Sequence, residues 1–129
     1  MDGLAELARQ AAESAWAPYS GFRVGAAVRA GGRDFPGCNV ENASYGLTIC
    51  AERVATFAAV TAGARRLQAL ALFTPGEEPS LPCGACLQVL AEFADPALPI
   101  RAACASGRVV DTTLGSLLTT PFTLGKGGR

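Results

Sequence analysis

The sequence contains no histidine, and only one tryptophan and one methionine occur among its 129 residues. Without imidazole, a catalytic metal must be held mainly by thiolates, and a proton shuttle must be a carboxylate. The longest nearly apolar stretch, residues 54–64, is too short to cross a bilayer. The first residues lack the basic segment of a secretory signal, so we expect a cytoplasmic protein without a membrane partner.

Neither sign of charge is in excess, because eleven Lys and Arg residues balance eleven Asp and Glu residues. The basic residues form no cluster or stripe, although such a patch is the electrostatic footprint of a nucleic-acid-binding surface. We therefore expect no nucleic-acid partner.

Half of the residues are hydrophobic and the mean hydropathy is +0.26, which predicts a folded chain. The length fits one domain over residues 1–129, with a glycine-rich tail from about residue 125. The five cysteines are an odd number, and two of them form a CxxC motif. In a reducing compartment this pattern favours metal or redox chemistry over a disulfide framework.

The pattern along the chain predicts alternating helices and strands. Leucines and alanines at helical spacing predict an amphipathic helix over residues 2–16. We expect further helices at 50–61, at 83–93 with Pro82 as its first residue, and after Thr113, and strands at 24–30, 34–40, 67–73, 100–104 and 109–113. The turn at Ser106-Gly107 is too short for a crossover, so the last two strands must be antiparallel. The sequence therefore predicts an α/β fold with a mixed sheet and helices on its faces.

The helix expected at 50–61 is unusually apolar, because Thr56 and Thr61 are the only polar residues from position 54 to 62. A helix that is apolar nearly all round is buried on all sides. A chain of this length has too little mass to cover it, so we expect a second subunit to do so.

Three cysteines are placed as metal ligands. Cys83 and Cys86 are three residues apart at the start of one helix, and Cys50 begins another. The positive ends of the two helix dipoles favour thiolates, which bind zinc tetrahedrally. Three protein ligands leave the fourth position open, as in catalytic zinc sites. Glu52 lies two residues from a ligand and can carry protons at the open position, with a pKa raised by enclosure near negative sulfurs.

Three thiolates and one Zn²⁺ make a negative site, which weakens the metal as a Lewis acid. Arg53 follows Glu52, and we expect its guanidinium to donate hydrogen bonds to the thiolates and to offset part of their charge. Gln88, on the helix of the CxxC motif, is expected to orient Arg53.

Other interpretations remain open for these cysteines. A lone CxxC also occurs in thioredoxin-type redox pairs and in structural zinc knuckles, although a redox pair needs neither a third cysteine nor a CxE motif. A structural zinc would recruit Cys38 or Cys104 as a fourth ligand, whereas both are typical of small core residues. A non-catalytic zinc-binding module therefore remains the alternative from another class, and it would not need Glu52.

Four segments carry a family resemblance: APYSGFRVGAA at 17–27, GCNVENASY at 37–45, CAER at 50–53 and PCGACLQ at 82–88. They resemble the small homotetrameric cytidine deaminases, and the match runs from about residue 4 to 122. The resemblance implies a three-layer α/β/α fold with a five-stranded mixed sheet and one zinc ion per subunit. It also implies hydrolysis of cytidine and deoxycytidine to uridine and deoxyuridine plus ammonia, in pyrimidine salvage. A zinc-activated water would attack C4, and Glu52 would protonate N3 and then the leaving amino group.

The resemblance further implies a set of substrate contacts. The backbone of Ala51 would meet the base, and Phe22 would pack against it. Asn39 and Glu41 would hold the ribose hydroxyls. Tyr45 and Phe122 would reach the pocket of a neighbouring subunit, so that a tetramer would share its active sites. Without the resemblance, Asn39 and Glu41 would be interpreted as a polar turn.

One position departs from the family pattern, since Leu87 stands where many members have arginine, which leaves more charge compensation to Arg53. Glu41 would repel a nearby phosphate, so free nucleosides fit better than nucleotides. Blasticidin-type deaminases, which use the same zinc set without the Asn39 and Glu41 pair, are the rival within the enzymes. Deaminases of adenosine in tRNA fit less well, because the basic surface and the metal-binding histidine are absent.

Overall fold

A computed structural model of the protein describes residues 1–125. The elements in chain order are α1 (Asp2–Ala11), the 3-10 turn η1 (Ala12–Ser14), β1 (Gly25–Ala30), β2 (Arg33–Cys38), the 3-10 turn η2 (Tyr45–Leu47), α2 (Ala51–Thr61), β3 (Ala69–Thr74), α3 (Gly84–Phe93), β4 (Pro99–Cys104), β5 (Val109–Thr113) and α4 (Leu114–Leu117). Within this part of the chain, no helix has the length and apolar character needed to span a bilayer. The predicted glycine-rich tail lies, except for Gly125, outside the described residues.

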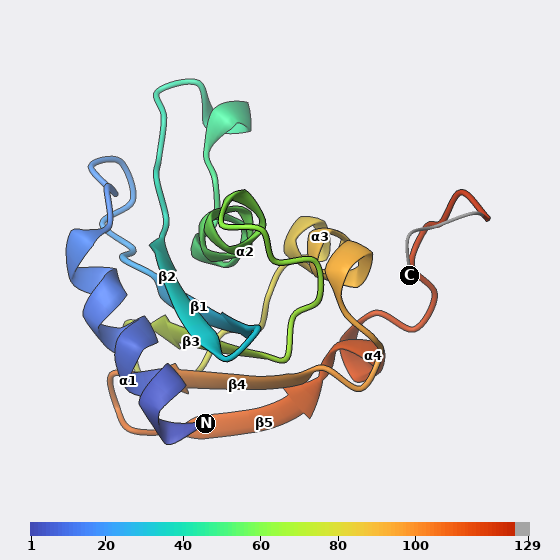
Figure 1. The fold of residues 1–129 in the computed structure, drawn as a ribbon. Helices are drawn as coiled ribbons and strands as arrows, with labels where there is room; N and C mark the ends of the chain where they lie inside the picture. The colour runs from blue at the N-terminus through green and yellow to red at the C-terminus, as the bar shows by residue number, and fades with distance from the viewer. Residues whose placement is uncertain (126–129) are drawn as a thin grey trace.

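The five strands form one mixed sheet in the order β2-β1-β3-β4-β5. Only β3 and β4 run parallel, and β4 and β5 form the predicted antiparallel hairpin. Helix α1 covers one face of the sheet, and α2 and α3 cover the other (Figure 1). The predicted three-layer α/β/α architecture is thus confirmed.

The strands divide their side chains between two cores because successive residues point to opposite faces of the sheet. Val28, Leu70 and Leu72 belong to the larger core, which the sheet forms with α2 and α3. Ala27 and Ala71 alternate with them and pack against α1 in a smaller core. The alanines on this second face let α1 lie close to the sheet, and Phe73 at the end of β3 also packs against this core.

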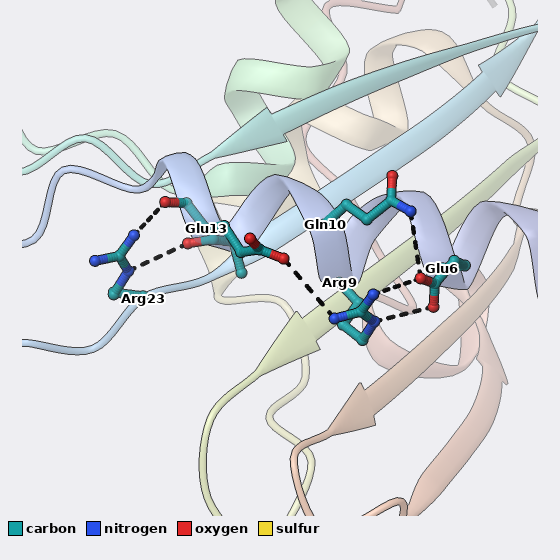
Figure 2. A network of polar contacts seen from close by, with 6 residues as sticks. Glu6, Arg9, Gln10, Glu13 and Arg23 are labelled. Atoms are coloured by element: carbon teal, nitrogen blue, oxygen red, sulfur yellow. Dashed lines mark hydrogen bonds and ion pairs between the residues drawn. The ribbon is translucent and has the colours of Figure 1, made fainter.

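The predicted helix at 2–16 is too long, since the α-helix ends at Ala11 and a 3-10 turn continues it to Ser14. The Arg23 guanidinium donates to the carbonyl oxygens of Ala12 (3.3 Å) and Glu13, both in this 3-10 turn (Figure 2), and so pairs with carbonyls at the end of the helical segment. The same view shows the solvent face of α1, where Arg9 pairs with Glu6 at 2.5 Å.

Two predicted helix starts are one residue too early. Cys50 is the N-cap of α2 and Cys83 is the N-cap of α3, and both have extended backbone angles. The sequence pattern predicts Pro82 as the first helical residue. In the structure Pro82 precedes the cap and lies outside the helix. Both metal-ligand candidates therefore sit at the point where a strand or loop turns into a helix.

Helix α2 is not buried on all sides in the single chain. Ala51, Ala55 and Ala59 are fully buried against the sheet, but Phe57 remains 46% exposed on the opposite flank. The inner flank packs exceptionally close. A Cβ atom added at Gly37 of β2 would lie 2.4 Å from the backbone nitrogen of Ala55, so strand and helix touch backbone to backbone.

Candidate active site

The three predicted ligands meet in space. The Sγ atoms of Cys50 and Cys83 are 4.0 Å apart, those of Cys83 and Cys86 are 3.6 Å apart, and all three lie within 4.8 Å of one another. Tetrahedral zinc with Zn–S bonds of about 2.3 Å places two sulfurs about 3.8 Å apart. The sulfur positions therefore fit a zinc ion, and Cys38 and Cys104 are not part of the cluster.

Cys50 and Cys86 shift each other's pKa in opposite directions. Hydrogen bonding with Cys86, and then with Arg53, lowers the pKa of Cys50 to about 5 despite partial burial. The hydrogen bond that Cys86 gives to Cys50, together with its burial, raises the pKa of Cys86. A metal needs these sulfurs as thiolates, and Cys50 is the ligand candidate whose pKa is lowered.

Arg53 lies beside the sulfur cluster, where its positive charge can offset the negative charge of the thiolates. Its Nη2 donates to the Sγ of Cys50 at 3.4 Å, and this contact raises the pKa of the guanidinium. Its Nε is buried and has no hydrogen-bond partner among the described residues. The side-chain amide of Gln88, which is expected to orient Arg53, makes its two hydrogen bonds with the backbone of Phe122 in this structure. Leu87 is buried in the larger core.

Glu52, in the first turn of α2, is only 5% exposed. Burial raises the pKa of its carboxyl to about 7, and the negative charge of Cys50 raises it further in the same direction. A carboxyl with this pKa exchanges protons at neutral pH, which is what general acid–base catalysis needs. The predicted raised pKa is confirmed, with desolvation as its largest cause.

A cavity of about 200 Å³ joins the sulfurs to the predicted base contacts. Its lining consists of Phe22, Val24, Asn39, Thr48, Cys50, Ala51, Glu52, Leu72, Thr74, Leu81 and Cys83. The structure thus brings Phe22, Asn39 and Ala51 to the same hollow as Glu52. Sequence reasoning missed Val24, Thr48, Thr74 and the two leucines, because strand and loop residues far apart in the chain carry no local pattern that links them.

Asn39 is buried and holds the loop that carries Phe22. Its Nδ2 donates to the carbonyl oxygen of Phe22 at 2.8 Å, and its Oδ1 accepts from the amide of Val24 at 2.9 Å. The amide keeps one N–H and one lone pair beyond these bonds. Asn39 therefore shapes the cavity wall and retains the capacity to bind a ligand group.

Glu41 and Tyr45 lie in a second cavity of about 400 Å³, which Tyr19, Ser20 and Thr48 complete. Thr48 lines both cavities, so the two hollows adjoin. Tyr45 is 78% exposed, and its ring meets that of Tyr19 edge to face at 6.3 Å. Phe122 lies beside α3, away from both linings, with 69% of its surface exposed.

Comparisons with known proteins agree with this geometry. Residues 2–102 match the model of the cytidine and deoxycytidylate deaminase zinc-binding region. The cytidine deaminase of Sporosarcina psychrophila is 45% identical over 115 residues, with 88% of this chain and 85% of the relative covered. That of Halalkalibacterium halodurans is 43% identical, with 93% and 92% covered.

Solved structures agree as well. The cytidine deaminase of Burkholderia pseudomallei superposes with a TM-score of 0.90 at 47% identity and covers 94% of this chain and 98% of its own. The enzyme of Mycobacterium tuberculosis superposes with a TM-score of 0.82 at 43% identity, covering 95% and 97%. The chain belongs to the cytidine and deoxycytidylate deaminase zinc-binding family.

Proposed function

We propose that this protein hydrolyses cytidine and deoxycytidine to uridine and deoxyuridine, with release of ammonia, in cytoplasmic pyrimidine salvage. The observation that carries the proposal is the shared cavity, in which the buried carboxyl of Glu52 lies among the sulfurs of Cys50 and Cys83. The names of the relatives support the choice of nucleoside, because each named above is a cytidine deaminase.

Cys50, Cys83 and Cys86 would hold the zinc ion. When bound, zinc supplies a Lewis acid that makes a water molecule nucleophilic at neutral pH. Glu52 takes one proton from the attacking water and delivers it to N3 of the ring. It then takes the second proton from the new C4 hydroxyl and gives it to the amino group, which leaves as ammonia while the C4 carbonyl forms. Its pKa of about 7 suits both directions of transfer. Arg53 offsets the thiolate charge through Cys50.

The remaining contacts place the nucleoside. Phe22 packs on the base and the backbone of Ala51 meets its polar edge, since both residues line the inner cavity. Asn39 in the inner cavity and Glu41 in the outer cavity hold sugar hydroxyls, with Thr48 between them. A carboxylate at this place also discourages a phosphate on the sugar.

We further propose that four chains assemble and share their active sites. The apolar outer flank of α2, with Phe57 exposed, supports an interface along this helix. Tyr45 and Phe122 are exposed aromatic residues away from the inner cavity, as residues that serve a neighbouring subunit would be. Light scattering of the purified protein should give the mass of four chains.

A mixing experiment tests whether the active sites are shared. If Glu52→Gln and Phe122→Ala each abolish activity, mixed assemblies of the two kinds of chain should regain part of it.

Ultraviolet absorbance of the purified protein with cytidine tests the activity. Deoxycytidine, cytosine, cytidine monophosphate and blasticidin S run in parallel. Turnover of the two nucleosides, with little for the other three, is the expected result. Preferred turnover of blasticidin S would favour the rival enzyme, and no turnover of any compound by a zinc-loaded protein would favour a non-catalytic module.

A further inference from the structure

Ser20 touches two of the residues that line the cavities. Its hydroxyl donates to Oε2 of Glu41, and its backbone amide donates to Oε1 of the same carboxylate at 3.1 Å. The amide of Tyr19 donates to Oε1 as well, at 2.9 Å. The hydroxyl oxygen of Ser20 also accepts from the amide of Phe22 at 2.9 Å. One serine therefore links the wall of the outer cavity to that of the inner one.

These bonds use most of what the carboxylate offers. An ionised carboxylate has about four lone-pair sites, and three of those on Glu41 are filled by the loop. The filled sites include both on Oε1, so the free site belongs to Oε2, beside the hydroxyl of Ser20. The hydrogen bond from that hydroxyl is also the largest cause that lowers the pKa of Glu41.

The loop that presents these donors is itself fixed to the site. The amide of Glu41 donates to the carbonyl oxygen of Trp16 at 2.8 Å, and the amide of Trp16 donates to that of Asn39 at 3.0 Å. The amide of Gly21 closes a turn on Ala17 at 2.9 Å. Backbone hydrogen bonds therefore hold the loop that carries Ser20. The only hydroxyl proton of Ser20 is donated to Glu41, so the hydroxyl has none left to donate to a ligand.

We propose that Ser20 is a positioning residue that aims the free lone pair of Glu41 at a single sugar hydroxyl of the substrate. The inference rests on the proposed function. Ser20 makes no contact with the reacting atoms, so its loss weakens substrate binding and leaves the chemical step unchanged. Specificity for the sugar then depends on a residue that does not bind the sugar.

Ser20→Ala removes the hydroxyl donor. The expected result is a KM for cytidine raised about tenfold, the usual order for one hydrogen bond to a charged group, with kcat changed less than about twofold. With 2′,3′-dideoxycytidine, which lacks the hydroxyls that Glu41 would bind, KM should rise about threefold at most, through Phe22 alone. Ser20→Thr keeps the hydroxyl and should restore KM to within about threefold of the original.

The double variant with Glu41→Ala separates this role from a structural one. In that background Ser20→Ala should change KM less than about twofold, because the carboxylate it aims is gone. Zinc content and circular dichroism check the fold, and Ser20→Cys, with a weak donor, replaces Ser20→Ala if the latter fails to fold.

Three results would overturn the inference: an unchanged KM in Ser20→Ala, an equal loss with the dideoxynucleoside, or additive effects with Glu41→Ala. Failure of the proposed function looks different, because the unsubstituted protein would then not convert cytidine at all. Glu41→Ala with an unchanged KM would remove the sugar contact and this inference together, while leaving the deaminase activity intact.

Discussion

The side-chain amide of Gln88 pairs with the backbone of Phe122 through two hydrogen bonds. Nε2 donates to the carbonyl oxygen at 3.0 Å, and Oε1 accepts from the amide at 3.1 Å. Gln88 lies two residues after Cys86 on α3, so the C-terminal segment is hydrogen-bonded to the helix that carries the candidate zinc ligand Cys86 and is capped by another, Cys83. The position of Phe122 is therefore set by a side chain 34 residues away in the sequence.

We predict that Gln88→Leu releases this segment. Two lost hydrogen bonds should speed amide hydrogen exchange of residues 119–125 by about tenfold or more, while exchange in the sheet stays unchanged. Gln88→Glu keeps the acceptor for the Phe122 amide and should have an intermediate effect. Exchange rates equal to those of the original protein would contradict the pairing.

Glu52→Gln should abolish most of the turnover and preserve the protein. Loss of the proton carrier is expected to lower kcat for cytidine by a factor of about 10² to 10⁴, because a glutamine cannot take up or release a proton. Zinc content and melting temperature should stay close to the original. Glu92→Gln, which neutralises an exposed carboxylate on α3, is the matched control and should retain full activity.

The ligand set makes a prediction about metal content. Cys83→Ala should lose the zinc ion that the original protein carries at one per chain, and chelation of the original protein should lower its melting temperature. Cys38→Ala and Cys104→Ala should retain zinc, because neither thiol belongs to the sulfur cluster. Metal analysis of the purified variants decides the matter: loss of zinc in either control variant would show a fourth protein ligand.

Gly37→Ala tests the contact between β2 and α2. The added Cβ would meet the Ala55 nitrogen at 2.4 Å and the Ala51 carbonyl oxygen at 2.8 Å, so the helix must move. We expect a loss of about 1–3 kcal/mol in the free energy of unfolding. Turnover should fall too, because Glu52 and Cys50 stand at the start of the displaced helix. Gly46→Ala meets nothing within 4 Å and is the control, measured by denaturant unfolding alongside it.

Stability at acid pH should depend on Asp111. Arg101 donates to both its carboxylate oxygens, at 2.8 and 3.2 Å, and these bonds lower the pKa of Asp111 below its ordinary value of 3.8. A lowered pKa contributes stability that is present above the ordinary value and is lost as the pH falls through the folded-state value. Asp111→Asn should therefore show a shallower fall in melting temperature below about pH 4, by calorimetry at low salt. Equal slopes would argue against the pair.

The metal cluster and Glu52 were predictable because a CxE motif and a PCxxC motif occur together and match a known deaminase signature. Helical spacing alone places only Cys83 and Cys86 on one face, and the approach of Cys50 to them depends on the fold. The exact helix starts were not predictable to the residue, since Cys50 and Cys83 act as caps with extended backbone although thiols have no strong cap preference. The sequence pattern also did not show that the α-helix changes to a 3-10 turn at Ala12, where Arg23 contacts the backbone from outside the helix.

Longer-range features escaped sequence reasoning for a common reason. The partner of Gln88 lies 34 positions away, and nothing local to Gln88 distinguishes Phe122 from Arg53 as its contact. The apolar composition of α2 correctly signalled burial, but it could not say which flank the chain itself covers, and Phe57 is left outside. Tertiary contacts between distant segments decide both points.

Helix α2 carries both the buried Glu52 of the candidate site and the exposed Phe57 of the surface. Its eleven residues span about 16 Å, with the proton-carrying glutamate in the first turn and Phe57 in the second. The inner flank of α2 packs closely on Gly37 of β2, so we expect a shift of the helix at its outer flank to move Glu52 as well. Substitutions at Phe57 should for this reason change both turnover and the oligomeric state. The position of Glu52 then restricts which residues can stand at the exposed flank of the same helix.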